Sequence, residues 1–223
     1  MTMEMNHPIP QPSPFQRCPE HTRLELAWPT PNHTLFKQPT LFFAGTRANP
    51  NYGRPGWTRD CGRRVHRGCD IASVDFTPTG QTTTVMFTNC QTGEEYPSIE
   101  PTFVPRDPVF CLFGGHVVEL ISNARESDLG IHAVIQHRWP NTQDTFFTFY
   151  GHLATYSVRK GELVERGQQV GVIGTTSRVA DARNWMAIAP HLHLEIWNAN
   201  RDPFDPEHFL RMHLRPELSN FGR

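Results

Sequence analysis

The sequence has no apolar run near the roughly 20 residues that are needed to span a bilayer, and we therefore expect no membrane span. It also lacks an excess of basic residues. With 21 basic and 22 acidic residues the formal net charge is −1, which leaves no footprint for nucleic acid, and we expect no such partner. The opening residues, MTMEMNHPIPQPSPF, have no basic stretch followed by an apolar one, so no secretory signal is visible.

Cysteine pairs with metal-binding spacing are missing as well. No CxxC occurs, so we expect no structural zinc site built from cysteines. The HExxH motif, in which a glutamate acts as the base beside zinc, is also absent. The odd number of cysteines leaves at least one outside any intramolecular disulfide, and the compartment stays open on this evidence. The five are Cys18, Cys61, Cys69, Cys90 and Cys111.

Sustained helical periodicity is scarce between residues 24 and 200, whereas β-rich runs are frequent. From residue 108 onward, VFCLFGGHVVELI, GIHAVIQH and TFFTFYGHL are separated by glycine or polar turns. The 20 prolines also favour strands and loops over helices. The sequence therefore predicts a mainly β protein, a single compact sandwich or barrel-like domain of antiparallel strands.

The predicted domain covers residues 23–212. Residues 1–22, rich in Pro, Gln and Ser, are expected to form a disordered or loosely docked tail, and 213–223 a second tail. The stretches LELAWP and TLFFAGTR are expected to form short strands or apolar anchors, and DPFDPEHFLRMHL a short terminal helix. Residues 74–105, rich in Thr and Pro around one plausible strand, TTTVMFT, are expected to form an inserted hairpin or surface loop.

The segment HLHLEIW, residues 191–197, alternates polar and apolar side chains with a period of two. This pattern predicts a strand whose leucines and isoleucine face the core, with His191, His193 and Glu195 sharing the other face. Two imidazoles two residues apart on one face can converge on one metal ion or one substrate. The alternative is a pair of half-exposed histidines on a sheet surface.

The segment HRGCD places His66 and Asp70 four residues apart, with Gly68 allowing a turn between them. Both side-chain types bind zinc. The alternative is a local surface pair. Taken with one of the two histidines of HLH, they would give three protein ligands and an open fourth position, which is the arrangement of a catalytic zinc site.

The segment YGHL supplies His152 at a strand end, where it is either functional or a loop residue. At this point five segments together resemble peptidase family M23, the zinc metallopeptidases of the LytM or lysostaphin type. They are HRGCD, YGHL, VRKGELVERGQQVGVIG and PHLHLEI, followed by DP, in that order between about residues 42 and 209.

The resemblance implies a LytM-like fold with a duplicated hybrid motif, one Zn²⁺ per chain, and hydrolysis of peptide bonds in peptidoglycan stem peptides or cross-bridges. It implies that His66, Asp70 and His193 bind the metal and that His152 and His191 are catalytic. With the ligand set complete, we expect Cys69 to pack or to pair with Cys61. In the family the chain usually runs almost directly from H-x-G-x-D into the next strand, whereas about 30 residues intervene here.

Two other functions remain open at this level. One is a LytM-like binding module that activates cell-wall amidases without catalysis, and the other is a carrier domain of the sugar phosphotransferase type. The implied function predicts a periplasmic or extracellular location. The absence of a visible signal leaves a cytoplasmic location or signal-independent export open. The oligomeric state and the scissile bond are not indicated by the sequence.

Overall fold

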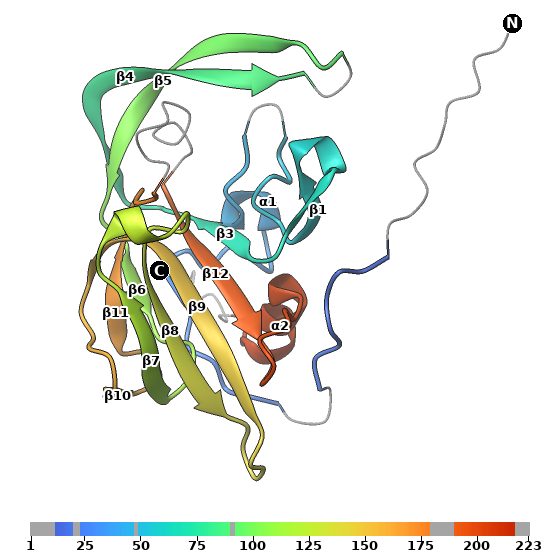
Figure 1. Cartoon of the computed structure of the whole chain (residues 1–223), viewed down its shortest axis with the longest axis vertical. Helices are drawn as coiled ribbons and strands as arrows, with labels where there is room; N and C mark the ends of the chain where they lie inside the picture. The colour runs from blue at the N-terminus through green and yellow to red at the C-terminus, as the bar shows by residue number, and fades with distance from the viewer. Residues whose placement is uncertain (1–11, 20–22, 47–48, 90–91, 179–189, 217–223) are drawn as a thin grey trace, which may run out of the picture.

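The computed structural model describes residues 12–19, 23–46, 49–89, 92–178 and 190–216 (Figure 1). The predicted mainly β class with antiparallel strands is confirmed, because the described helices are short and the strand pairings are antiparallel. The helices are α1 (Pro39–Phe42) and α2 (Pro206–His213), with 3₁₀ turns at Asp60–Gly62 and Ala124–Glu126. The strands are β1 (Gly56–Arg59), β2 (Arg64–His66), β3 (Cys69–Ala72), β4 (Phe76–Thr88), β5 (Glu95–Pro105), β6 (Pro108–Phe110), β7 (Gly115–Ile121), β8 (Ile131–Arg138), β9 (Thr145–Tyr156), β10 (Leu163–Val164), β11 (Gln169–Ile173) and β12 (His191–Trp197).

The main sheet has eight strands and is organised around the long strand β9. The order β10-β7-β8-β9-β11-β6 forms its path, while β12 pairs with both β9 and β3. In this register His193 of β12 lies opposite Gly151 of β9 on one side and opposite Asp70 of β3 on the other. Three segments that are distant in sequence are thereby fixed side by side through backbone hydrogen bonds.

The period-two pattern of β12 is reflected in its packing. Leu192, Leu194 and Ile196 are fully buried in the main hydrophobic core, as the alternation predicts. Burying each such side chain contributes roughly 1.5–3 kcal/mol to folding. Because side chains alternate across a strand, this packing directs His191 and His193 to the opposite face.

Helix α2 lies beside β12, which is a strand of the main sheet (Figure 1). The side chain of Asp205 caps its N-terminus by accepting a hydrogen bond from the backbone N–H of His208, and Pro206 occupies the first turn, where its missing N–H costs nothing. Phe209 and Leu210 are buried in the main core. The helix ends at His213, one residue beyond the predicted end of the domain, and the imidazole of this residue accepts a hydrogen bond from the backbone N–H of Leu24 at 3.2 Å.

Strands β4 and β5 form a two-stranded hairpin that projects from the rest of the molecule (Figure 1). The pairing runs from Phe76 opposite Pro105 to Thr88 opposite Glu95, with an irregularity between Pro78 and Thr82. The ring of Phe76 packs edge-on against Phe103, with ring centroids 5.0 Å apart. The sequence indicated only one strand of seven residues here, whereas β4 alone has 13 residues.

The N-terminal segments pack onto the sheet as irregular chain. Leu24 and Leu26 are buried but form no strand, and the TLFFAGTR stretch starts in helix α1, so the strand alternative for both is wrong and the anchor alternative holds. Of the predicted N-terminal tail, 1–11 and 20–22 lie outside the described residues, as do 217–223 of the predicted C-terminal tail. Gln16 forms a parallel bridge with Phe204, so this part of the predicted tail is docked.

Candidate metal centre

The turn between β2 and β3 brings two of the predicted ligands together. His66 is the last residue of β2 and Asp70 the second residue of β3, and both side chains are buried. A Cβ on Gly68 would lie 2.7 Å from Cε1 of His193 and 2.7 Å from the carbonyl oxygen of Leu194. A glycine is therefore required at this position because the turn passes directly against β12.

Three side chains from β2, β3 and β12 converge on one point. His66 Nε2 lies 3.2 Å from Asp70 Oδ1 and 3.2 Å from His193 Nδ1, and His193 Nδ1 lies 2.9 Å from Asp70 Oδ1. These three atoms form the only group with metal-ligand geometry that was found among the described residues. The alternative of a local surface pair for His66 and Asp70 is wrong, and so is that of half-exposed histidines on β12, since all of these residues are buried.

The far side of each imidazole is held by an acceptor. His66 Nδ1 donates to the carbonyl oxygen of Arg54 at 2.9 Å, so Nε2 is the nitrogen that faces the centre. His193 Nε2 donates to Glu195 Oε1 at 2.9 Å, so Nδ1 faces the centre. The indole Nε1 of Trp197 donates to the second oxygen of Glu195 at 2.7 Å. Such outer partners fix ring orientation at metal sites.

The protonation of the cluster follows from burial and charge. Burial alone would raise the pKa of Asp70, but the neighbouring charges of His66, His191 and Arg59 hold it well below its usual range, so the carboxylate is ionised. Burial lowers the pKa of His66. Burial also opposes a charge on His193, yet its hydrogen bonds to Asp70 and Glu195 raise its pKa to about 9, so a metal ion that binds Nδ1 displaces a proton.

His152 and His191 flank this cluster. Nε2 of His191 lies 3.7 Å from Asp70 Oδ1, and the ring of His152 lies 5.2 Å from that of His191 and 5.7 Å from that of His193, between centroids. Nδ1 of His152 donates to the carbonyl oxygen of Thr176 at 2.9 Å, which leaves Nε2 as its unprotonated nitrogen. Burial, followed by the charges of His191 and His193, holds the pKa of His152 well below its usual range.

The backbone of His152 is in an uncommon conformation, with a φ of +59°. Its N–H donates to the carbonyl oxygen of Leu129 at 2.8 Å, and together with the Thr176 contact this fixes the residue from two loops. A positive φ in a residue other than glycine costs of order 1 kcal/mol or more and is concentrated at functional sites.

The structure brings all five predicted site residues to one cavity, of about 280 Å³.

Sequence reasoning missed Arg59, which also lines this cavity. Its Nη2 hydrogen-bonds the second carboxylate oxygen of Asp70 and lies 2.9 Å from His66 Nε2. The sequence does show four arginines shortly before His66, in the turn-rich segment GRPGWTRDCGRR, and this was the one hint that an arginine lies near the site. Nothing in that signal indicates which of the four side chains points inward.

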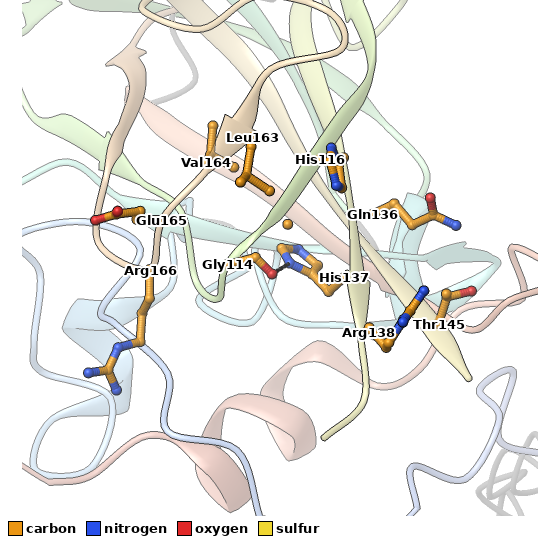
Figure 2. A pocket seen from close by; sticks show the side chains of 11 residues that line it. Gly114, His116, Gln136, His137, Arg138, Thr145, Leu163, Val164, Glu165 and Arg166 are labelled. Atoms are coloured by element: carbon orange, nitrogen blue, oxygen red, sulfur yellow. Dashed lines mark hydrogen bonds between the residues drawn. The ribbon is translucent and has the colours of Figure 1, made fainter. Parts of the chain in front are cut away.

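A larger cavity, of about 610 Å³, lies between β10 and the strands β7 and β8 (Figure 2). His137 lines this cavity, and Figure 2 shows its bond to Gly114, in which Nδ1 donates to the carbonyl oxygen at 3.1 Å. Its Nε2 accepts from the Thr148 hydroxyl at 2.7 Å. Burial lowers the pKa of His137 to about 4. The group of three potential metal ligands found among the described residues lines the smaller cavity, which is therefore the candidate site.

The cysteine beside the ligands is structural. Cys69 is a free, fully buried thiol whose pKa is raised well above its usual range by burial, so it packs rather than pairs. Its expected alternative partner, Cys61, is disulfide-bonded and therefore is not bonded to Cys69. Cys90 lies outside the described residues.

Comparison with known proteins adds a family to this geometry. Residues 101–206 match the model of Peptidase family M23. The match covers 106 of the 223 residues, just under half of the chain. The matched M23 segment contains His152, His191 and His193, whereas His66 and Asp70 precede it.

Two curated relatives of this M23 segment come from Vibrio cholerae. The peptidoglycan DD-endopeptidase ShyA is 40% identical over 67 residues, which are 30% of this chain and 13% of the relative. The peptidoglycan DD-endopeptidase ShyB is 32% identical over 94 residues, which are 42% of this chain and 18% of the relative. The match thus spans less than a fifth of the length of either relative.

Solved structures of peptidases were matched as well. Lysostaphin from Staphylococcus simulans is 20% identical, with a TM-score of 0.45, over 82% of this chain and 58% of the other. A zinc-containing peptidase from Vibrio cholerae is 30% identical, with a TM-score of 0.36, over 56% of this chain and 35% of the other.

None of the described helices is long and apolar enough to cross a bilayer.

Proposed function

We propose that this chain is a zinc-dependent peptidase in which His66, Asp70 and His193 hold one Zn²⁺. The observation that carries the proposal is the convergence of two imidazole nitrogens and one carboxylate oxygen, 2.9–3.2 Å apart. Tetrahedral zinc with bonds of about 2.0–2.2 Å needs ligand atoms separated by roughly 3.3–3.6 Å, a few tenths of an ångström more than these separations. The donor set and its spacing therefore fit zinc.

Bound zinc would act as a Lewis acid on the peptide carbonyl and lower the pKa of an attacking water toward about 7. The role of His152 in this reaction is that of a base. Its Nδ1–H bond to Thr176 leaves Nε2 unprotonated, and its lowered pKa keeps it so at neutral pH. It can therefore accept the proton of the attacking water.

Nε2 of His191 lies 3.7 Å from Asp70 Oδ1, and the ring of His191 meets that of His152 edge-on, with centroids 5.2 Å apart. An N–H from this imidazole would donate to the oxyanion that forms from the scissile carbonyl. Donors already fixed in a buried site stabilise such a charge without reorganisation. We propose this role for His191.

We propose peptide bonds of peptidoglycan as the substrate. Support comes from the names of the curated relatives, both of which are peptidoglycan DD-endopeptidases. This substrate implies action in the periplasm or outside the cell. The carrier alternative is disfavoured because Asp70 and His193 converge on Nε2 of His66, which makes this atom part of a three-donor set, and the intact ligand set disfavours a non-catalytic module.

The test is zinc stoichiometry followed by digestion of purified peptidoglycan. We expect about one zinc per wild-type chain, and loss of zinc and of digestion in His193→Ala. His208→Ala, which changes an exposed histidine of α2, is the matched control and should retain both. A folded wild-type chain that binds no zinc even when zinc is supplied would exclude the proposal.

A further inference from the structure

Arg59 makes contacts that neither the M23 match nor the sequence motifs assign. It is the last residue of β1 and is only 8% exposed. Its guanidinium carbon lies 3.8 Å from the centre of the Tyr52 ring, and its Nη2 contacts two of the three proposed ligands, Asp70 and His66. A buried cation in contact with ligands for another cation calls for a physical explanation.

The two contacts of Arg59 differ in what they leave for a metal ion. On Asp70 the guanidinium takes Oδ2, whereas Oδ1 is the oxygen that lies near His66 and His193. A metal ion on Oδ1 and Arg59 on Oδ2 are therefore compatible. On His66 the guanidinium donates toward Nε2, which has a single lone pair. A metal ion and Arg59 cannot both use that lone pair.

The position of Arg59 is fixed by its surroundings. Arg59 lies opposite Arg64 in the pairing of β1 with β2, and the carbonyl oxygen of Arg59 accepts a hydrogen bond from the N–H of Arg63 at 3.1 Å. The planar guanidinium packs on the face of Tyr52, an arrangement that is favourable for a desolvated cation. The contacts of Arg59 to Tyr52 and to Oδ2 of Asp70 do not involve Nε2 of His66, so they can remain when this nitrogen is released.

We propose that Arg59 is a positioning residue that sets the affinity of the centre for its metal. It neutralises Asp70 and keeps the three ligands together before metal binds, and it yields Nε2 of His66 when metal arrives. Because its positive charge stays near the metal, it also weakens metal binding. The inference rests on the proposed zinc site and concerns how strongly that site binds.

The experiment compares Arg59→Met with the wild-type chain. Methionine removes the charge and the hydrogen bonds while keeping an unbranched side chain against Tyr52. We expect the zinc dissociation constant, measured by competition with a chromophoric chelator at pH 7.5, to fall roughly tenfold or more because a nearby like charge is removed. We also expect the metal-free variant to melt at a lower temperature and to gain more from added zinc.

Two further variants separate this role from a general loss of charge. Arg63→Met removes an exposed arginine from the same segment, and its zinc affinity should equal that of the wild type. Arg59→Lys keeps the charge and serves as the folded test case if Arg59→Met fails to fold. Its zinc affinity should lie nearer that of the wild type, since a lysine ammonium retains the repulsion.

The outcomes distinguish this inference from the proposed function. Zinc binding by the wild type with equal or weaker binding by folded Arg59→Met would overturn the role of Arg59 alone. Equal tightening in Arg63→Met would overturn it too, because the effect would then be one of net charge. No zinc bound by any folded variant would overturn the proposed zinc site and this inference with it.

Discussion

Glu195 offers the sharpest test of how the centre is organised. Its carboxylate accepts hydrogen bonds from Nε2 of His193 at 2.9 Å and from the indole of Trp197 at 2.7 Å, and it is 6% exposed. Replacing Glu195 with Gln keeps the shape of the side chain but removes its charge. The amide oxygen can still accept from His193, but as a weaker acceptor it makes the ligand nitrogen less basic.

The magnitude follows from the same contacts. Loss of an outer partner typically weakens metal binding 10- to 100-fold, which is about 1.4–2.7 kcal/mol. The Glu195 bond is one of two that raise the pKa of His193 to about 9, so the pKa of this imidazole should fall in Glu195→Gln. We therefore expect the zinc dissociation constant to rise 10- to 100-fold, measured by chelator competition at pH 7.5.

Trp197→Phe is the matched control for this prediction. It removes the other hydrogen bond of the Glu195 carboxylate while keeping an aromatic ring against Phe149, whose centroid lies 5.6 Å away. We expect a change in zinc affinity smaller than that of Glu195→Gln. A folded Glu195→Gln with unchanged affinity, or an equal effect of both substitutions, would refute the view that Glu195 acts through His193.

Three further outcomes are expected. Gly68→Ala should abolish zinc binding measured by elemental analysis, because the new Cβ would lie 2.7 Å from Cε1 of His193 and displace the ring; a full zinc complement would contradict this. Burial lowers the pKa of His137 to about 4 in the folded chain, so as the pH falls this imidazole is protonated in the unfolded chain before it is protonated in the folded one. The free energy of unfolding should therefore drop by roughly 3 kcal/mol between pH 6.5 and pH 4 from this residue alone. In urea titrations at several pH values, His137→Gln should reduce this dependence of the free energy of unfolding on pH. An unchanged dependence would exclude its assignment to His137. Zinc at a hundredfold excess over its dissociation constant should stabilise the wild type by about 2.7 kcal/mol in thermal melts, and a shift of the same size in His193→Ala would show that zinc acts elsewhere.

The face of β12 that carries His191, His193 and Glu195 was predictable because a strand has a period of exactly two residues along its length. The grouping of His66 with Asp70 was predictable because both lie within one short turn. The choice of His193 over His191 as a ligand could not be made from periodicity. It needs the register between β12 and β3, which places His193 opposite Asp70.

The inserted hairpin was one of the two forms predicted for residues 74–105, and β4 and β5 confirm it, whereas the inward direction of Arg59 and the lengths of the hairpin strands escaped prediction. The inward direction of Arg59 depends on the pairing of β1 with β2, which shifts register between Gly56 and Arg59. The hairpin contains prolines and threonines, and threonine runs with proline give no clear strand boundary. Neither hairpin strand contributes a residue to the lining of the candidate site.

The position of β12 between β3 and β9 has a consequence for how the protein matures. His193 is separated from His66 by 127 residues and from Asp70 by 123, and its strand is the last to be synthesised among those described. A chain still emerging from the ribosome therefore has two of the proposed ligands but cannot close the set. Closing so long a loop is an entropic cost that the inserted strand must offset. The three proposed ligands would therefore come together only when β12 joins a nearly complete sheet, and chains that end before His193 would lack the full set.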